Sequence, residues 1–208
     1  MRRRIRMKNK EAYHHGNLQK ALLYEGLKTL GQKGEDGLSL RELAKRCGVS
    51  VAAPYAHFKN KDEFIYALQD EVMRKLVEKL EITRTKYCEE KSILIEMGMS
   101  YVLYFVENPH HFSLLFSKSE HVQAVLWQED SGKNPAFDEL RKAAEPILSH
   151  FGVPQVAQHN ILLAMWALVH GLAAIVCLHD IASRLREDPE ALHSLRNILT
   201  VFSGPEPQ

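Results

Sequence analysis

Cysteine, net charge and catalytic motifs are all scarce in this chain of 208 residues. Its three cysteines, Cys47, Cys88 and Cys177, stand far apart and form no CxxC pair. A disulfide scaffold is therefore excluded, and an odd number of cysteines without a secretory leader fits the reducing cytoplasm. No apolar segment follows the basic N-terminus, so we do not expect a signal peptide.

The sequence also lacks the patterns typical of hydrolases, nucleotide-binding enzymes and metalloenzymes. It contains no GxSxG, no phosphate-binding glycine loop and no HExxH. The pairs His14-His15 and His110-His111 are adjacent, and neighbours on a helix point apart, which does not favour shared metal ligation. We therefore expect no enzymatic activity, no metal ion and no cofactor.

Charge is present in quantity but is unevenly distributed. The chain has 27 basic and 26 acidic side chains. Residues 1–61 carry 14 basic and 5 acidic side chains, a net charge of +9, whereas residues 62–208 carry 13 basic and 21 acidic, a net charge of −8. Six of the basic residues lie within residues 1–10, which we interpret as a flexible arm. This asymmetry indicates that the first third of the chain meets a polyanion.

Apolar residues recur at spacings of three and four, and no alternating strand pattern flanked by hairpin turns is present. We predict an all-α fold with an N-terminal three-helix helix-turn-helix domain over residues 1–60. A C-terminal helical domain over 61–202 and a disordered tail over 203–208 should follow. The expected helices cover residues 17–33, 40–47, 50–58, about 25 residues from position 61, 93–107, 112–116, 137–151, 154–178 and a last segment from 189.

The segment from Leu38 to Phe58 predicts a helix-turn-helix. Ser39 and Glu42 have the spacing of a capping box, Gly48 suits the end of the first helix, and Ser50 suits the start of the second, with Pro54 in its first turn. An ordinary helical hairpin would tolerate the same residues. Read as a DNA-binding unit, the motif offers these candidate contacts: Ser39, Arg41, Ser50, Ala52, Ala53, Tyr55, His57, Lys59 and Lys61.

In this region the sequence resembles the TetR family of transcriptional regulators. The resemblance implies that Tyr55, His57 and Lys61 contact backbone phosphate and that Ala52 and Ala53 face bases. The chain departs from the family pattern at Pro54, where recognition helices usually have another residue. The matching residues are Tyr13-His14-His15-Gly16-Asn17-Leu18, Gly37-Leu38-Ser39-Leu40-Arg41-Glu42-Leu43-Ala44, Gly48-Val49-Ser50, Pro54-Tyr55-Ala56-His57-Phe58, Lys61 and Phe64.

The longest apolar stretch, residues 161–178, is borderline for a membrane span, which needs about 20 apolar residues. His170 at its centre favours a buried helix or a subunit seam instead, and we expect no membrane association. Small residues recur on one face of this helix, and apolar residues recur in the last helix. Together they predict a homodimer, through Ala164, Ala167, Gly171, Ala174, Leu192, Leu195, Ile198 and Leu199.

Trp166, His170 and Gly171 resemble the Trp-His-Gly signature of one C-terminal subclass of the family. Trp166 and His170 lie one turn apart on one helix face. They either pack in a core with a satisfied imidazole or line an effector cavity. The candidate lining of such a cavity is Met97, Tyr101, Tyr104, Phe112, Trp166 and His170.

These observations predict a dimeric cytoplasmic regulator, a repressor released from a palindromic operator in double-stranded DNA by a small hydrophobic effector. One alternative is a helical small-molecule-binding or hydrolytic protein with a vestigial DNA-binding head. Another is an architectural DNA protein without a ligand. A steep loss of DNA affinity with salt would argue against the first alternative, and a saturable thermal shift with a small molecule would argue against the second.

Overall fold

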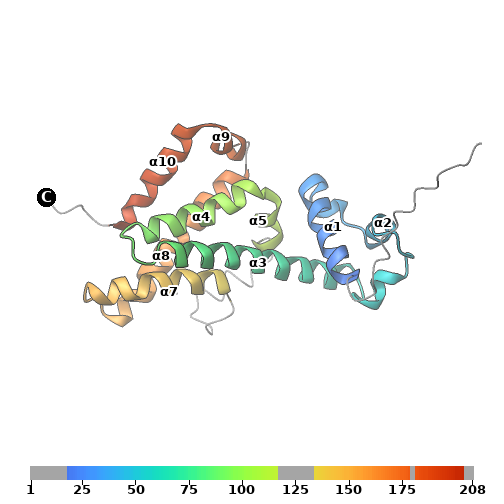
Figure 1. Ribbon diagram of the computed structural model, residues 1–208, viewed down its shortest axis with the longest axis horizontal. Coiled ribbons are helices and arrows are strands. Elements are labelled where there is room, and N and C mark those ends of the chain that lie inside the picture. The colour runs from blue at the N-terminus through green and yellow to red at the C-terminus, as the bar shows by residue number, and fades with distance from the viewer. Residues whose placement is uncertain (1–17, 117–133, 179–180, 204–208) are drawn as a thin grey trace, which may run out of the picture.

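A computed structural model describes residues 18–116, 134–178 and 181–203 (Figure 1). Within these ranges every regular element is a helix, which confirms the all-α prediction. The α-helices are α1 (Leu18–Lys33), α2 (Leu40–Arg46), α3 (Lys61–Lys86), α4 (Ile93–Glu107), α5 (Pro109–Phe116), α7 (Pro135–His150), α8 (Gln155–Leu178), α9 (Ile181–Glu187) and α10 (Pro189–Leu199). Short 3₁₀ turns are η2 (Glu35–Gly37), η3 (Ala53–Ala56) and η4 (Thr200–Ser203). The predicted basic arm and the end of the predicted tail lie outside the described residues.

Several helices begin where side-chain chemistry dictates. The Asn60 side chain accepts a hydrogen bond from the Glu63 backbone N–H (2.8 Å) and caps α3. Asn134 caps α7 through the Phe137 N–H in the same way, at 3.1 Å. Asp188 caps α10, and a proline then occupies the first turn. The short helix α9, which precedes this cap, was not predicted.

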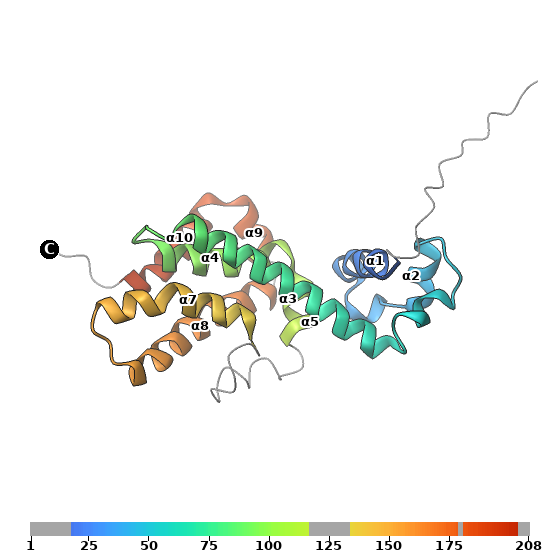
Figure 2. The same cartoon turned by 60° about the horizontal axis from the view of Figure 1, so that its bottom comes forward.

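The long helix α3 joins two regions of the molecule (Figures 1 and 2). Its first turns pack against α1, which contacts α2 and η3; we call residues 18–68 the head. A tight contact holds this unit together: a Cβ added to Gly26 of α1 would lie 2.6 Å from the Phe64 ring of α3. Phe64 also meets the Phe58 ring edge-on, with centroids 5.0 Å apart. These contacts pack the head around Phe58 and Phe64, and its buried apolar residues are continuous with those of the rest of the molecule.

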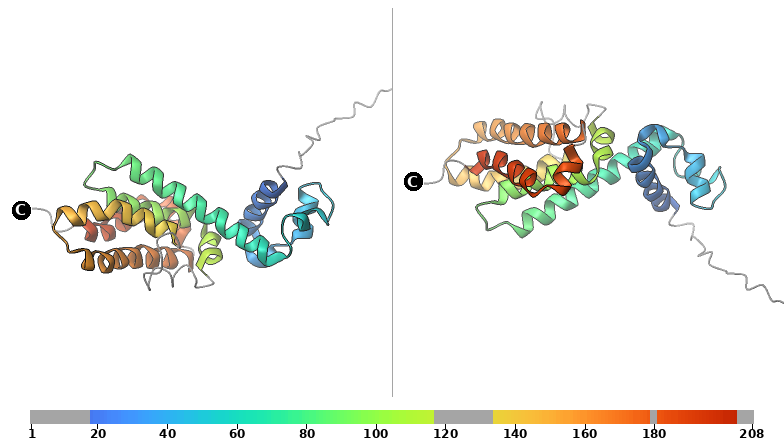
Figure 3. Two further views of the ribbon diagram at one scale, coloured as in Figure 1. Left: turned by 90° about the horizontal axis from the view of Figure 1, so that it is seen from below. Right: turned by 90° about the horizontal axis from the view of Figure 1, so that it is seen from above.

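A second unit, which we call the bundle, consists of the remainder of α3 together with α4, α5 and α7 to α10 (Figure 3). Helix α4 lies at its centre and contacts α3, α5, α7, α8, α9 and α10. This central place explains why α4 is apolar nearly all round. Helix α8 packs against α4, α5, α7 and α9. Over Gln155–Cys177, α8 is long and apolar enough to cross a membrane by length and composition alone, a test that core helices of soluble proteins also pass.

Candidate DNA-binding surface and effector cavity

The turn after α2 is built around Gly48. Its φ of +70° lies in the left-handed region that favours glycine. The Gly48 N–H donates to the Lys45 carbonyl (3.1 Å), and the Val49 N–H donates to the Ala44 carbonyl (3.0 Å). These bonds close the C-terminus of α2 and redirect the chain into residues 50–57.

The predicted second helix over residues 50–58 is wrong in its extent, because only a 3₁₀ turn from Ala53 to Ala56 forms. The Ala53 N–H donates to the Ser50 carbonyl (3.0 Å), and the Tyr55 N–H donates to the Ala52 carbonyl (3.1 Å). Both bonds span three residues. Pro54 has no N–H, so the α-helical bond from position 54 to Ser50 cannot form and the tighter turn replaces it.

The predicted capping box at the start of α2 is also wrong. Ser39 occupies the N-cap position, but its side chain accepts no capping bond. Glu42 does not reach back to Ser39 either, because its carboxylate pairs with the Lys45 ammonium at 2.7 Å. The pKa of Glu42 is lowered by this hydrogen bond from Lys45. The Ser39 hydroxyl therefore does not cap α2.

Most candidate DNA contacts lie on the outside of the head. The Tyr55 side chain is 47% exposed. Ser39 and Ala53 are only partly exposed, and Ala53 packs against the core. The remaining candidates are exposed: Arg41, Ser50, Ala52, His57, Lys59 and Lys61.

The cations of the head differ in what they bind. Lys59 lies 3.3 Å from Glu63, and Arg46 donates to the Thr29 hydroxyl at 2.9 Å, which ties α2 to α1. Arg41 and Lys61 form no ion pair with any described residue. These two exposed cations flank the turn in sequence and suit contacts with an external anion such as phosphate.

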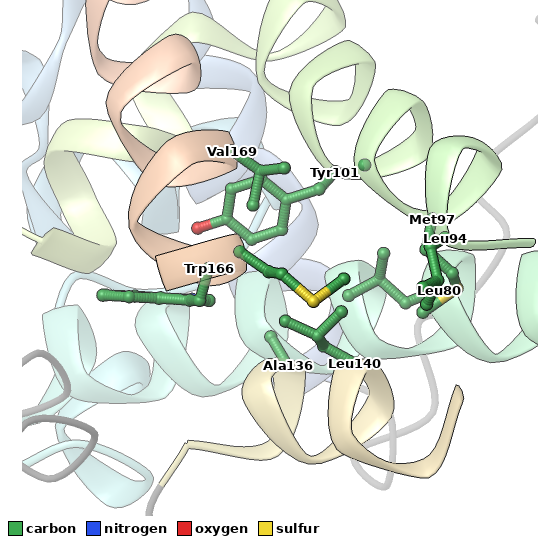
Figure 4. Close-up of a pocket in the computed structure, with 10 residues that line it drawn as sticks. Leu80, Leu94, Met97, Tyr101, Ala136, Leu140, Trp166 and Val169 are labelled. Carbon is green, nitrogen blue, oxygen red and sulfur yellow. The ribbon is translucent and has the colours of Figure 1, made fainter. Parts of the chain in front are cut away.

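A small cavity lies in the bundle between α3, α4, α7 and α8 (Figure 4). The centre of a water-sized sphere can occupy about 20 Å³ of it. That volume suits about one water molecule, so a drug-sized ligand would require the walls to move. Two flexible methionines are among the lining residues and can give way. The lining is Leu80, Leu94, Met97, Gly98, Tyr101, Ala136, Leu140, Met165, Trp166 and Val169.

Of the six residues predicted to line a cavity, Met97, Tyr101 and Trp166 line this one. His170 lies behind the wall: its ring stacks on the Trp166 ring, with centroids 4.5 Å apart, and its Nδ1 is 2.9 Å from the Tyr101 hydroxyl. Phe112 does not line the cavity either, and its ring lies 5.0 Å from the His170 ring between centroids. The seven remaining lining residues were missed, because their apolar spacing signals burial and does not distinguish a cavity wall from a filled core.

Tyr104 belongs to a second tyrosine–histidine pair, away from the cavity. Its hydroxyl donates to the Val72 carbonyl of α3 (3.1 Å) and lies 3.1 Å from Nδ1 of His111 in α5. The hydroxyl has one proton, so His111 must supply the second bond through its Nδ1–H. Burial lowers the pKa of both His111 and His170 to about 4 and raises the pKa of Tyr101 and Tyr104 above the usual range. All four side chains are therefore neutral at pH 7.

The short helix α5 connects this aromatic cluster with the head. Phe112 and Phe116 of α5 both contact the His170 ring. The Gln69 amide of α3 donates to the Leu114 carbonyl of α5 at 2.7 Å in a buried bond. Helix α5 also packs against α1. Helix α5 therefore contacts both the His170 ring and the head.

Two buried polar atoms in this part of the bundle have no hydrogen-bond partner among the described residues: Nε1 of Trp166 and Nε2 of His159. The Trp166 side chain is only 5% exposed. The Phe137 ring lies near both, 6.3 Å from the His159 ring and 6.4 Å from the Trp166 ring. A buried N–H without an acceptor costs about 1–3 kcal/mol, so Trp166 is a site where an acceptor from outside the protein would be stabilising.

Comparison with known families decides the identity of the chain. Residues 22–68 match the family model described as "Bacterial regulatory proteins, tetR family", and residues 94–202 match "Tetracyclin repressor-like, C-terminal domain". The second model alone covers more than half of the chain. The chain belongs to the TetR family. It is thus a DNA-binding transcriptional regulator, with the helix-turn-helix in the head.

Solved structures share the fold of this TetR-family protein. A protein of unknown function from Rhodococcus sp. RHA1 is 23% identical, with a TM-score of 0.70 over 93% of this chain and 98% of that one. The TetR-family regulator PfmR from Thermus thermophilus is 21% identical, with a TM-score of 0.56 over 90% and 99%. A TetR variant from Acinetobacter baumannii AYE, solved with minocycline, is 19% identical, with a TM-score of 0.55 over 87% and 93%. No curated protein matches the sequence of the chain.

One face of α8 in this TetR-family protein is left accessible by the residues that the structure describes. Ala164 and Ala167 are exposed, and a Cβ added to Gly171 would meet nothing within 4 Å. In α10 the predicted seam is partly wrong, because Leu195 and Leu199 are buried in the protein's own core. Leu199 packs closely on α4, where a Cβ on Gly98 would lie 3.1 Å from it. The predicted residues of α10 that stay accessible are Leu192, which is partly exposed, and Ile198, which is 48% exposed.

Proposed function

We propose that this TetR-family regulator is a cytoplasmic repressor that binds a palindromic operator as a homodimer and is released by a small hydrophobic effector. The observation that carries the DNA-binding part is the exposed turn of the head, with Tyr55 at its surface. Arg41 and Lys61, on either side of the turn in sequence, are exposed and form no ion pair with any described residue. Such an arrangement suits a turn in the major groove with phosphates on either side. Binding, not catalysis, is the proposed role.

Replacing Tyr55 tests this placement. Tyr55→Ala should weaken binding to duplexes selected from a random library by about tenfold, because a hydrogen bond to a charged phosphate contributes about 1.5–3 kcal/mol. The matched control is Tyr24→Ala, which removes another exposed tyrosine from α1 of the head. Unchanged affinity of the Tyr55→Ala protein, with its thermal unfolding also unchanged, would refute the proposed surface.

The basic arm is proposed to add phosphate contacts, although it lies outside the described residues. Each phosphate neutralised contributes about −0.9 to the slope of log affinity against log salt. Removing residues 1–10 should therefore make this slope shallower by at least about one. An identical slope with and without the arm would show that it does not touch DNA.

The homodimer is proposed to form through the uncovered face of α8 and the accessible side of α10. Small side chains on α8 would let two copies approach closely, and exposed Ile175 and Ile198 would supply apolar area. Gly171→Leu should separate the subunits in analytical ultracentrifugation. Gly31→Leu is the control, because Gly31 also faces open space but lies on α1 in the head. A dimer as stable in Gly171→Leu as in the parent would place the interface elsewhere.

The effector is proposed to enlarge the cavity between α3, α4, α7 and α8. Its apolar lining favours a hydrophobic, aromatic compound, and the unpartnered N–H of Trp166 favours one that carries a carbonyl or another acceptor. The likeness to the Trp-His-Gly subclass belongs to this proposal, since Trp166 and His170 are its signature residues. An effector that moves Trp166 would displace the stacked His170 and, with it, α5. Binding to one head arrangement more tightly than to the other would then lower operator affinity.

Trp166 fluorescence provides the test in a Trp127→Phe background, which removes the second tryptophan. Compounds that release DNA should change the Trp166 emission. A His170→Ala variant should bind them with altered affinity, because the ring that supports Trp166 is gone. If releasing compounds leave the Trp166 emission unchanged and bind the His170→Ala protein equally well, the effector site is not this cavity.

A further inference from the structure

The tip of the exposed turn in the head is apolar. Val51 is 50% exposed, and Ala52 and Ala56 beside it in the chain are also exposed. By contrast, Ala53 packs partly against the core and Pro54 is buried. Val51, Ala52 and Ala56 carry no side-chain hydrogen-bonding group, whereas the exposed Ser50 and Tyr55 of the same turn each carry a hydroxyl.

Val51 is unusual for the surface on which it lies. Residues 18–68 are all described, and among them Val51 is the only large aliphatic side chain that is exposed. The other exposed large apolar side chains in this range, Tyr24, Tyr55 and Tyr66, each carry a hydroxyl. An isoleucine, leucine or valine in the head is otherwise at least partly buried. The fold of the head itself therefore does not account for a valine at position 51.

The sequence around Val51 bears on the choice of partner. Arg41 and Lys61, each ten residues from Val51 along the chain, are exposed cations without an ion pair among the described residues, and Lys59 is exposed as well. In the proposed docking these cations meet phosphates and the turn enters the major groove, where the C5 methyl of thymine is the apolar group on the base edges. An exposed valine suits contact with that methyl group.

We propose that Val51, with Ala52 beside it, reads thymine methyl groups in each operator half-site. Discrimination at those positions then comes from apolar contact, and not from hydrogen bonds to base edges. Selected operators should carry thymine where Val51 lies. This inference rests on the proposed placement of the turn in the major groove.

Deoxyuridine tests it directly, since it differs from thymidine only by the absent methyl group. Duplexes selected from a random library by the full chain are resynthesised with each half-site thymidine replaced in turn, and affinity is measured at fixed salt. We expect a loss of about fourfold at one or two positions, the effect of one buried methyl group at about 0.8 kcal/mol. Val51→Ala should weaken binding to the parent duplex by a similar factor and should become indifferent to uridine at those positions.

The control variant is Ile82→Ala, which removes an aliphatic side chain that is 60% exposed on α3, outside the head. It should keep both the parent affinity and the uridine sensitivity. If every uridine substitution leaves the parent affinity unchanged, or if Val51→Ala stays as sensitive as the parent, thymine reading by Val51 is overturned. In that case a loss of binding in Tyr55→Ala still supports the proposed docking of the turn, whereas unchanged binding in both variants overturns the docking itself.

Discussion

The head and the bundle satisfy their polar groups in different ways. In the head the ion pairs are mostly local and exposed, as between Glu42 and Lys45, three residues apart. The bundle has local ion pairs as well, as between Arg74 and Glu71, but it also has polar contacts that join distant segments. Tyr101 meets His170, 69 residues away, and Arg196 meets Glu96, 100 residues away. These contacts tie packed helices to one another, which a pair three residues apart on one helix cannot do.

The largest expected effect is the loss of stability when a buried phenylalanine is removed from the head or from the bundle. Phe64 in the head and Phe105 in the bundle are both fully buried. Each change to alanine should cost about 3–5 kcal/mol of stability, because it removes a large apolar side chain and leaves a cavity. Phe64→Ala should abolish DNA binding and keep the dimer, whereas Phe105→Ala should weaken the dimer and effector binding. Calorimetry measures the stability of each variant, DNA titration measures its operator affinity, and sedimentation measures its dimer. If both variants lose DNA binding and the dimer to the same extent, the two regions unfold as one.

A smaller loss of stability is expected when an ion pair is removed, and it should differ between the bundle and the head. The Glu139 side chain in α7 is 3% exposed and pairs with Arg84 of α3 (2.8 Å) and with Lys142. Glu139→Gln should cost about 2 kcal/mol, less than a fully buried pair, since both cations can still reach water. Glu42→Gln in the head should leave stability unchanged, because that pair is exposed on both sides. Urea unfolding measures both costs, and equal unfolding midpoints for the two variants would contradict the expected difference in stability.

The smallest effect concerns pH. The pKa of His170 and of His111 is lowered by burial to about 4 from an ordinary 6.5. The unfolded chain thus takes up protons at a higher pH than the folded chain, so stability should fall as pH falls from about 6.5 to about 4. His170→Gln should reduce this loss by about half. Melting temperatures between pH 7.5 and 4.5 check this; a parallel profile for His170→Gln would disprove it.

The course of the head could be predicted from the sequence, because local rules govern it. Gly48 provides the predicted left-handed residue after α2. Helix α3 begins at the predicted position 61, where Asn60 caps it through the Glu63 N–H, three residues away. Both wrong predictions in the head have a local cause. The Glu42 carboxylate pairs with Lys45 instead of forming a capping box, and Pro54 lacks the N–H that an α-helix would need at that position.

In the bundle, residue spacing indicated which helix faces are apolar but not which faces meet. Whether Trp166 and His170 point into a cavity or behind its wall depends on how α4, α5 and α8 pack, and no rule of spacing contains that information. The same holds for Leu195 and Leu199, whose spacing suits a subunit seam and a monomer core equally well. Local hydrogen bonds act over a few residues and leave a mark in the sequence. Contacts 69 or 100 residues apart arise only when whole helices have packed, and that packing assigned each apolar face either to the protein's own core or to its surface.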